Sequence, residues 1–111
     1  MRSKGSQPTA AQKRWREEVR ALGSVISGGP AVIHHPVGCS GKHNKVEIGH
    51  WWVIPLTDEE HKALHNGVLN VNGSRKDWEK FMFSRVCMLL MGKCKDFPSE
   101  EVICAIQDYH K

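Results

Sequence analysis

Apolar residues recur at helical spacing in four parts of the chain, and each of these parts is predicted to be a helix. Thr9 is followed three residues later by Gln12, the spacing of a capping box, so a helix is expected to begin there and to end at Gly23. Thr57 begins a second capping box and predicts a shorter helix over 58–66.

Two more apolar patterns with helical spacing follow in the last third of the chain. Ser74 is expected to cap a helix over 75–91, and Ser99 is expected to cap a final helix near the C-terminus. The residues expected to be buried in these two helices are Trp78, Phe81, Met82, Val86, Leu89, Leu90, Val102, Ile103, Ile106 and Tyr109.

Two segments between the first and second helices have the composition of strands. Residues 31–37 are apolar apart from two histidines, and Pro36 restricts them to an edge strand. Residues 50–56 are rich in aromatic and β-branched side chains, and the polar residues 38–49 are predicted to be a loop. Because two strands alone are marginally stable in water, this hairpin must pack against helices or bind an ion.

The predicted order of elements indicates a small α+β protein with a single domain. The chain has 111 residues, of which 1–8 are expected to be a flexible basic tail and 9–111 to be the domain. The longest uncharged stretch, 21–41, contains two prolines and five glycines and therefore cannot span a membrane. No secretory signal is found at the N-terminus, so the expected location is the cytoplasm.

Charge and cysteine content add two expectations. The 16 basic and 12 acidic side chains leave a net charge of +4, and a basic surface favours an anionic partner such as DNA. Alternatively, the first helix is a solvated charged surface without a ligand, since Glu17 and Glu18 interrupt its basic residues. The four cysteines form no C-x-x-C pair and are predicted to be reduced core residues. The candidate phosphate-contacting residues are Lys13, Arg14, Arg16, Arg20, Lys42 and Lys45.

Histidine is the unusual feature of the composition. Six of the seven histidines fall within the 32 residues from His34 to His65, where even spacing would place about two. His61 and His65 are four residues apart on a predicted helix, so their imidazoles share one face, at a spacing that suits a metal ion. His34 and His35 are adjacent on a predicted strand and therefore point to opposite sides. A strand that supplies one histidine and a helix that supplies two would make a three-histidine site with open coordination positions.

The segment HHPVGCSGKHNKVEIGHWWVIPLTDEEHKALH resembles the ββα-metal, or HNH, endonuclease motif, in which a histidine-containing hairpin and a helix hold one divalent cation. More narrowly, ALGSVISGGPAVIHH followed by GHWWVIPLTDEEH is similar to the phage recombination enhancement function (Ref) family of RecA-dependent nucleases. The resemblance covers about residues 10–66, with the motif itself over about 31–66.

This resemblance implies a role for each histidine of the motif. His34, His61 and His65 would bind one divalent ion, which could be Mg²⁺, Mn²⁺, Zn²⁺ or Ni²⁺. His35 would be the general base that activates water, and His50 would contact phosphate or steady that base. The implied activity is hydrolysis of DNA phosphodiester bonds with little sequence specificity. The implied partner besides DNA is a RecA-type filament, and the implied origin is a phage or prophage acting in recombination or repair.

The sequence departs from the family pattern at several positions. Trp52 stands where the HNH motif has an asparagine that helps to orient the base histidine. Ser24, Ser27 and Thr57 stand where relatives often have cysteines, so no structural zinc is expected. Two alternatives to an enzyme stay open: a catalytically silent nucleic-acid-binding module with the same fold, and a structural metal-binding protein that acts through a partner.

Overall fold

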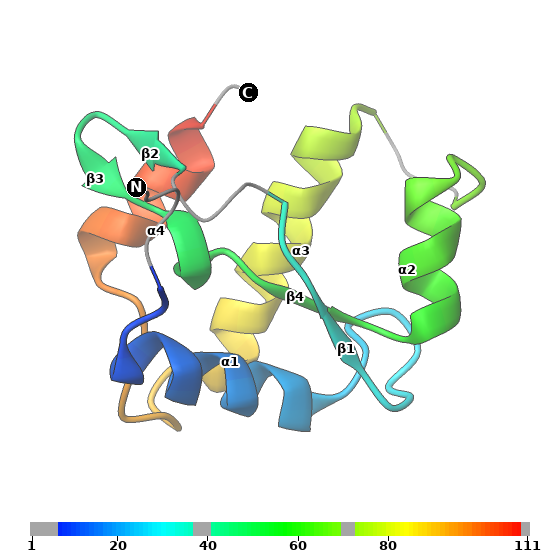
Figure 1. The fold of residues 1–111 in the computed structure, drawn as a ribbon, viewed down its shortest axis with the longest axis horizontal. Helices are drawn as coiled ribbons and strands as arrows, with labels where there is room; N and C mark the ends of the chain where they lie inside the picture. Colours follow the sequence, from blue (N-terminus) through cyan, green and yellow to red (C-terminus); the bar gives the residue numbers. More distant parts are fainter. Residues whose placement is uncertain (1–6, 37–40, 70–72, 110–111) are drawn as a thin grey trace.

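The computed structural model describes residues 7–36, 41–69 and 73–109, and these residues form a mixed α+β fold (Figure 1). No helix in these ranges is both long and apolar enough to cross a membrane. Of the predicted tail 1–8, residues 1–6 lie outside the described ranges. The elements are α1 (Ala10–Leu22), β1 (Val32–His34), β2 (Lys42–His43), β3 (Val46–Glu47), the 3₁₀ turn η1 (Gly49–Trp51), β4 (Ile54–Leu56), α2 (Asp58–His65), α3 (Arg75–Leu90) and α4 (Glu100–Asp108).

The predicted helix starts are confirmed, because each helix begins after the residue expected to cap it. At α1 the backbone N–H of Thr9 donates to Gln12 Oε1 (2.8 Å), and the N–H of Gln12 donates to Thr9 Oγ1 (3.1 Å). Thr57 and Glu60 make the same reciprocal pair of bonds at α2, over 2.8 and 3.1 Å. These bonds satisfy N–H groups that have no partner inside a helix, and they fix where each helix begins.

The antiparallel pair β1–β4 lies at the centre of the fold. Its register places His34 opposite Ile54 and Val32 opposite Leu56. Helices α1, α2 and α3 all contact this pair, while α4 packs against the separate β2–β3 hairpin, as Figure 1 shows. The pair is therefore stabilised by helices, as two-stranded sheets require.

The strands are shorter than predicted. Of residues 50–56 only the last three form a strand, because Gly49 (φ 38°) and the bond from Trp51 N–H to the Ile48 carbonyl (2.8 Å) make a turn. The turn lets Trp52 be fully buried and lets the carbonyl of Trp51 accept a hydrogen bond from Trp15 Nε1 (3.0 Å). An alternating strand would have directed the two adjacent tryptophans to opposite faces.

The other two predicted segments also differ from the structure. In the segment 31–37 only Val32–His34 is a strand, and Val37 lies outside the described residues. The predicted loop 38–49 contains the β2–β3 hairpin, whose two-residue turn has positive φ at Asn44 (53°) and Lys45 (68°). Positive φ at both central residues is the conformation of a type I′ turn, which matches the twist of two antiparallel strands.

The predicted core residues of helix α3 are confirmed in part, since Trp78, Val86 and Leu90 are buried and Met82 is half-buried. Phe81 and Leu89 are 58% and 44% exposed, so the prediction that they are core residues is wrong. Apolar side chains occur all round this helix, and their spacing therefore did not identify the inner side. The residues that α3 buries are Trp78, Glu79, Phe83, Val86, Cys87 and Leu90.

The prediction that the cysteines are core residues is only partly correct. Cys87 is buried, and burial together with neighbouring Cys94 raises the pKa of its thiol to about 12. Cys94 is half-buried beyond the end of α3, and Cys104 is exposed on α4. Cys39 lies outside the described residues.

Gly23 ends α1 in a conformation that other residues rarely adopt (φ 86°, ψ 173°). A Cβ atom there would lie 2.8 Å from the carbonyl oxygen of Gly28, a backbone atom that cannot rotate away. We expect Gly23→Ala to lower the free energy of unfolding by about 1–3 kcal/mol, measured by urea denaturation. Gly28→Ala is the matched control, because Gly28 also has positive φ (80°) but a Cβ there meets no described atom within 4 Å. Equal losses for the two variants would show that the close contact at Gly23 has no effect.

Candidate metal centre

Three histidines from β1 and α2 converge on one point. His34 is the last residue of β1, and His61 and His65 lie one turn apart on α2. One ring nitrogen from each histidine can be chosen so that all three lie within 4.8 Å of one another. The convergence of His34, His61 and His65, expected from the sequence, is therefore present in the structure.

The distances between these rings suit a single ion. The Nε2 atoms of His61 and His65 are 3.1 Å apart. The centroid of the His34 ring lies 5.2 Å from that of the His61 ring and 5.6 Å from that of the His65 ring. Two nitrogens that each lie about 2.0–2.1 Å from a zinc ion are separated by a similar distance. Burial lowers the pKa of His61, as do the charges of its two histidine neighbours, which favours the neutral ring that a metal needs.

Exposure increases across the cluster. His34 is buried, His61 is half-buried and His65 is exposed. Three protein ligands with solvent on one side leave coordination positions open, which distinguishes catalytic metal sites from closed structural ones.

His34 has a buried acidic neighbour that the sequence did not reveal. Its Nε2 lies 2.6 Å from Oε2 of Glu79 on α3, and both side chains are only 1% exposed. Burial alone would raise the pKa of Glu79, but the hydrogen bond with His34 and the charges of Lys76 and Arg75 hold that pKa below its ordinary value. Nδ1 of His34 is buried and has no hydrogen-bond partner among the described residues.

His35 directly follows the last residue of β1, and its side chain is exposed. Its ring lies 6.0 Å from that of His50, with the two planes perpendicular. Although the side chain is exposed, neighbouring protein groups partly desolvate its ring and so lower the pKa of His35, as do the charges of His50, Arg16, His34 and His61. The lowered pKa favours the neutral imidazole of His35, whose ring lies near both the three-histidine cluster and a cation of α1.

The candidate phosphate-contacting residues are placed unequally. The charge of Arg16 on α1 lowers the pKa of His35. Arg14 instead forms an ion pair with Asp96 (2.6 Å), and Arg20 forms one with Glu17 (2.5 Å).

The three remaining candidates lie elsewhere. Lys13 is on the exposed side of α1, beside Arg14 and two glutamates. Lys42 and Lys45 belong to the β2–β3 hairpin, which Figure 1 places beside α4 and on the opposite side of the molecule from α2. Arg16 is therefore the candidate best placed to meet a phosphate at the histidines.

Ser24, Ser27 and Thr57, the positions where the resemblance to Ref-like proteins would place cysteines, lie around one carboxylate. Ser24 Oγ donates to Glu60 Oε1 (2.5 Å) and accepts from the backbone N–H of Ser27 (3.1 Å). Thr57 N–H donates to the same Glu60 oxygen (2.8 Å). This hydrogen-bond network joins the turn after α1 to the first turn of α2.

Trp52, which stands where the HNH motif that the sequence resembles has an asparagine, is a core residue. Its ring packs edge-on against Tyr109 (5.8 Å), and the ammonium of Lys76 lies over it at 5.2 Å. The ring beside His35 is instead that of His50.

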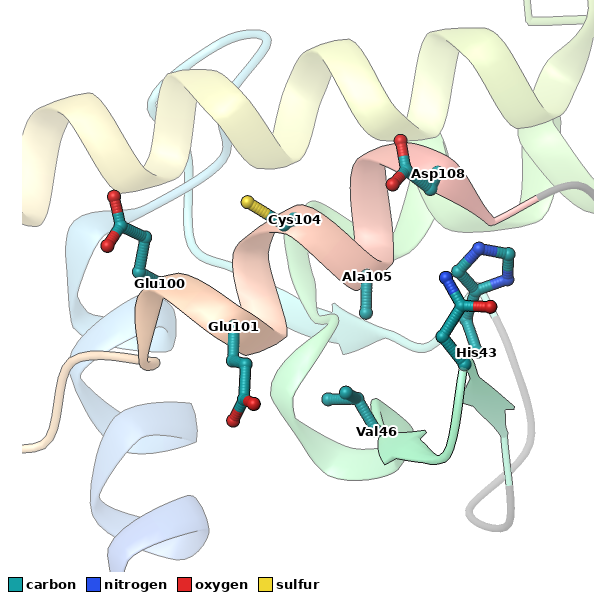
Figure 2. A pocket seen from close by; sticks show the side chains of 8 residues that line it. His43, Val46, Glu100, Glu101, Cys104, Ala105 and Asp108 are labelled. Atoms are coloured by element: carbon teal, nitrogen blue, oxygen red, sulfur yellow. The ribbon is translucent and has the colours of Figure 1, made fainter.

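A cavity of about 380 Å³ lies between the β2–β3 hairpin and α4, as Figure 2 shows. His43 and the carboxylates of Glu100, Glu101 and Asp108 line it, and the metal-centre histidines do not. Three carboxylates would repel a phosphate, so this cavity does not suit the DNA backbone.

Sequence reasoning missed Glu79 and Arg75. Arg75 Nε lies 3.2 Å from Glu79 Oε2, and the charge of Arg75 also acts on His61. The signal in the sequence was a glutamate directly after Trp78 and on the same side of the helix as Phe83 and Val86. A charged residue in the buried stripe of a helix requires a partner.

No match to this chain was found among protein-family models, curated proteins or solved structures. Function must therefore be inferred from the residues of the site.

Proposed function

We propose that this protein is a metal-dependent endonuclease of the HNH type that hydrolyses phosphodiester bonds in DNA. The observation that carries the proposal is the three-histidine cluster with an exposed face, directly followed in the chain by His35, a histidine whose pKa lies below its ordinary value. A Lewis acid beside a general base is the combination that phosphodiester hydrolysis needs.

The fit of a metal to this site rests on the donors themselves. Nδ1 of His34 is a buried nitrogen without a described hydrogen-bond partner, and the Nε2 atoms of His61 and His65 face each other over 3.1 Å. Three imidazoles suit zinc or nickel, whereas magnesium and manganese prefer oxygen ligands. When bound, a divalent ion would polarise the scissile phosphate and stabilise the leaving oxygen.

The remaining steps belong to the protein. A ring nitrogen of His35 takes the proton from the attacking water, and the nearby charge of Arg16 attracts the phosphate on the same side. The perpendicular ring of His50 lies against His35 and restricts its rotation. Phosphate contacts of this kind carry no sequence information, so cleavage is expected at many sequences.

Cleavage of plasmid and single-stranded DNA tests this proposal. We expect nicked or linear products with manganese, nickel, zinc or magnesium, and no products with excess EDTA. His65→Ala, purified in the same way, controls for contaminating nuclease because it removes only an exposed ligand. Reactions with and without a RecA-type filament on the DNA test whether the filament directs cleavage. DNA binding without cleavage in every reaction would contradict the proposal and favour a silent binding module.

A further inference from the structure

We infer that Glu79 is a positioning residue of the metal centre: its carboxylate accepts the Nε2–H of His34 and so presents Nδ1 of His34 to the metal. This inference rests on the proposed metal site, and it assigns to α3 a part in a site whose ligands come from β1 and α2. Glu79 does not belong to the three-histidine group itself.

The two nitrogens of the His34 ring have different surroundings. Nε2 lies 2.6 Å from Glu79 Oε2, a distance typical of a hydrogen bond to an ionised carboxylate. Nδ1 is buried and has no hydrogen-bond partner among the residues described. A carboxylate can only accept, so Nε2 must carry the proton and Nδ1 must hold the lone pair. The nitrogen of His34 that remains for a metal is Nδ1.

Two cations keep Glu79 in place. Arg75 Nε lies 3.2 Å from Oε2, and Lys76 Nζ lies 3.7 Å from Oε1. Lys76 Nζ also lies 3.4 Å from the carbonyl oxygen of Pro36, two residues after His34. Because a buried carboxylate is costly unless it is paired, these contacts explain how Glu79 stays ionised beside the site.

The arrangement has a clear chemical consequence. A carboxylate that accepts the second N–H of a metal-bound histidine fixes the tautomer, restrains the ring and makes the other nitrogen a better donor. His34 is the ligand that most needs this restraint, because it comes from a three-residue strand whereas His61 and His65 share a capped helix.

Nitrogen NMR of the histidine rings in the zinc-loaded full chain tests the inference directly. We expect the proton of His34 on Nε2 and zinc on Nδ1. Zinc on Nε2 of His34 would overturn the inference, because the ion would then occupy the place of the Glu79 hydrogen bond. This measurement needs no variant and is informative even if changes at Glu79 prevent folding.

Zinc affinity of Glu79→Gln provides the second test. The amide oxygen still accepts from Nε2–H but carries no charge, and we expect zinc to bind about 10–100-fold more weakly. Asp96→Asn is the matched control, since it removes a carboxylate paired with Arg14 on the other side of α1, and its zinc affinity should equal that of the wild type. Unchanged affinity in folded Glu79→Gln would overturn the role of Glu79 alone. Failure of the wild type to bind zinc would overturn the proposed metal site and this inference together.

Discussion

Replacing His35 with alanine is expected to lower the rate of metal-dependent DNA cleavage by about 10²–10⁴-fold. The side chain is exposed and does not belong to the three-histidine cluster, so its removal should leave that cluster intact. Zinc affinity and thermal stability should therefore match those of the wild type. The loss would come from the missing proton acceptor, since a neutral imidazole is the proton acceptor best matched to neutral pH.

His43→Ala is the matched control for this variant. His43 belongs to β2, and its ring contacts that of Tyr109 (6.3 Å) instead of the cluster. We expect His43→Ala to cleave DNA at the wild-type rate, measured from the initial rate of plasmid nicking. A wild-type rate in His35→Ala would contradict the assignment of the base and direct attention to His50.

Loss of one metal ligand is expected to have the second large effect. His65→Ala should weaken zinc binding by at least about 100-fold. Loss of a residue that only hydrogen-bonds to a metal ligand already lowers metal affinity about 10–100-fold, and loss of a ligand itself should lower it more. At 100 times its dissociation constant, zinc should stabilise the wild type by about 2.7 kcal/mol, a rise in Tm of roughly 10 °C. The variant should show little or no rise at the same zinc concentration.

Lys62→Ala controls for changes in α2 itself. Lys62 lies on the outer side of this helix, where it pairs with Asp58 (3.1 Å), and its removal leaves the three imidazoles in place. Its Tm should rise with zinc as that of the wild type does. An equal rise in His65→Ala would contradict the ligand assignment.

Chelation of the wild type separates a catalytic from a structural ion. We expect the chain to stay folded in EDTA, because an apolar core around Trp15, Trp52 and Phe83 holds the fold together and only one of the three proposed ligands, His34, is buried. Unfolding on chelation would favour the alternative of a structural metal-binding protein.

Local sequence signals predicted the helices well. Each of the four helices begins after its capping residue, because a cap such as Thr57 acts on N–H groups two or three residues away and needs no distant partner. Helical i, i+4 spacing placed His61 and His65 on one face, and strand alternation predicted that one of His34 and His35 would join them; the choice of His34, which the structure brings to the cluster, came from the resemblance to the HNH motif.

Features that depend on distant partners were not predictable in this way. Trp52 and Phe81 are both large aromatic residues in apolar runs, yet one is fully buried and the other is 58% exposed. Which of them faces the core depends on how α3 and the η1 turn pack, and periodicity alone contains no such information. Glu79 pairs with His34 across 45 positions of sequence, so its role became visible only in three dimensions.

The hydrogen bond between His34 and Glu79 also limits which part of the chain could transfer the three-histidine site to another protein. The three histidines of the candidate metal centre lie within residues 31–66, a segment short enough to be transplanted into another protein. In this fold, however, the segment also contributes Trp52 and Ile54 to a core completed by α1, α3 and α4, and its first ligand depends on α3. Transplanting residues 31–66 alone would leave His34 without Glu79 as its hydrogen-bond acceptor and would expose apolar side chains. The whole domain would therefore have to be transplanted.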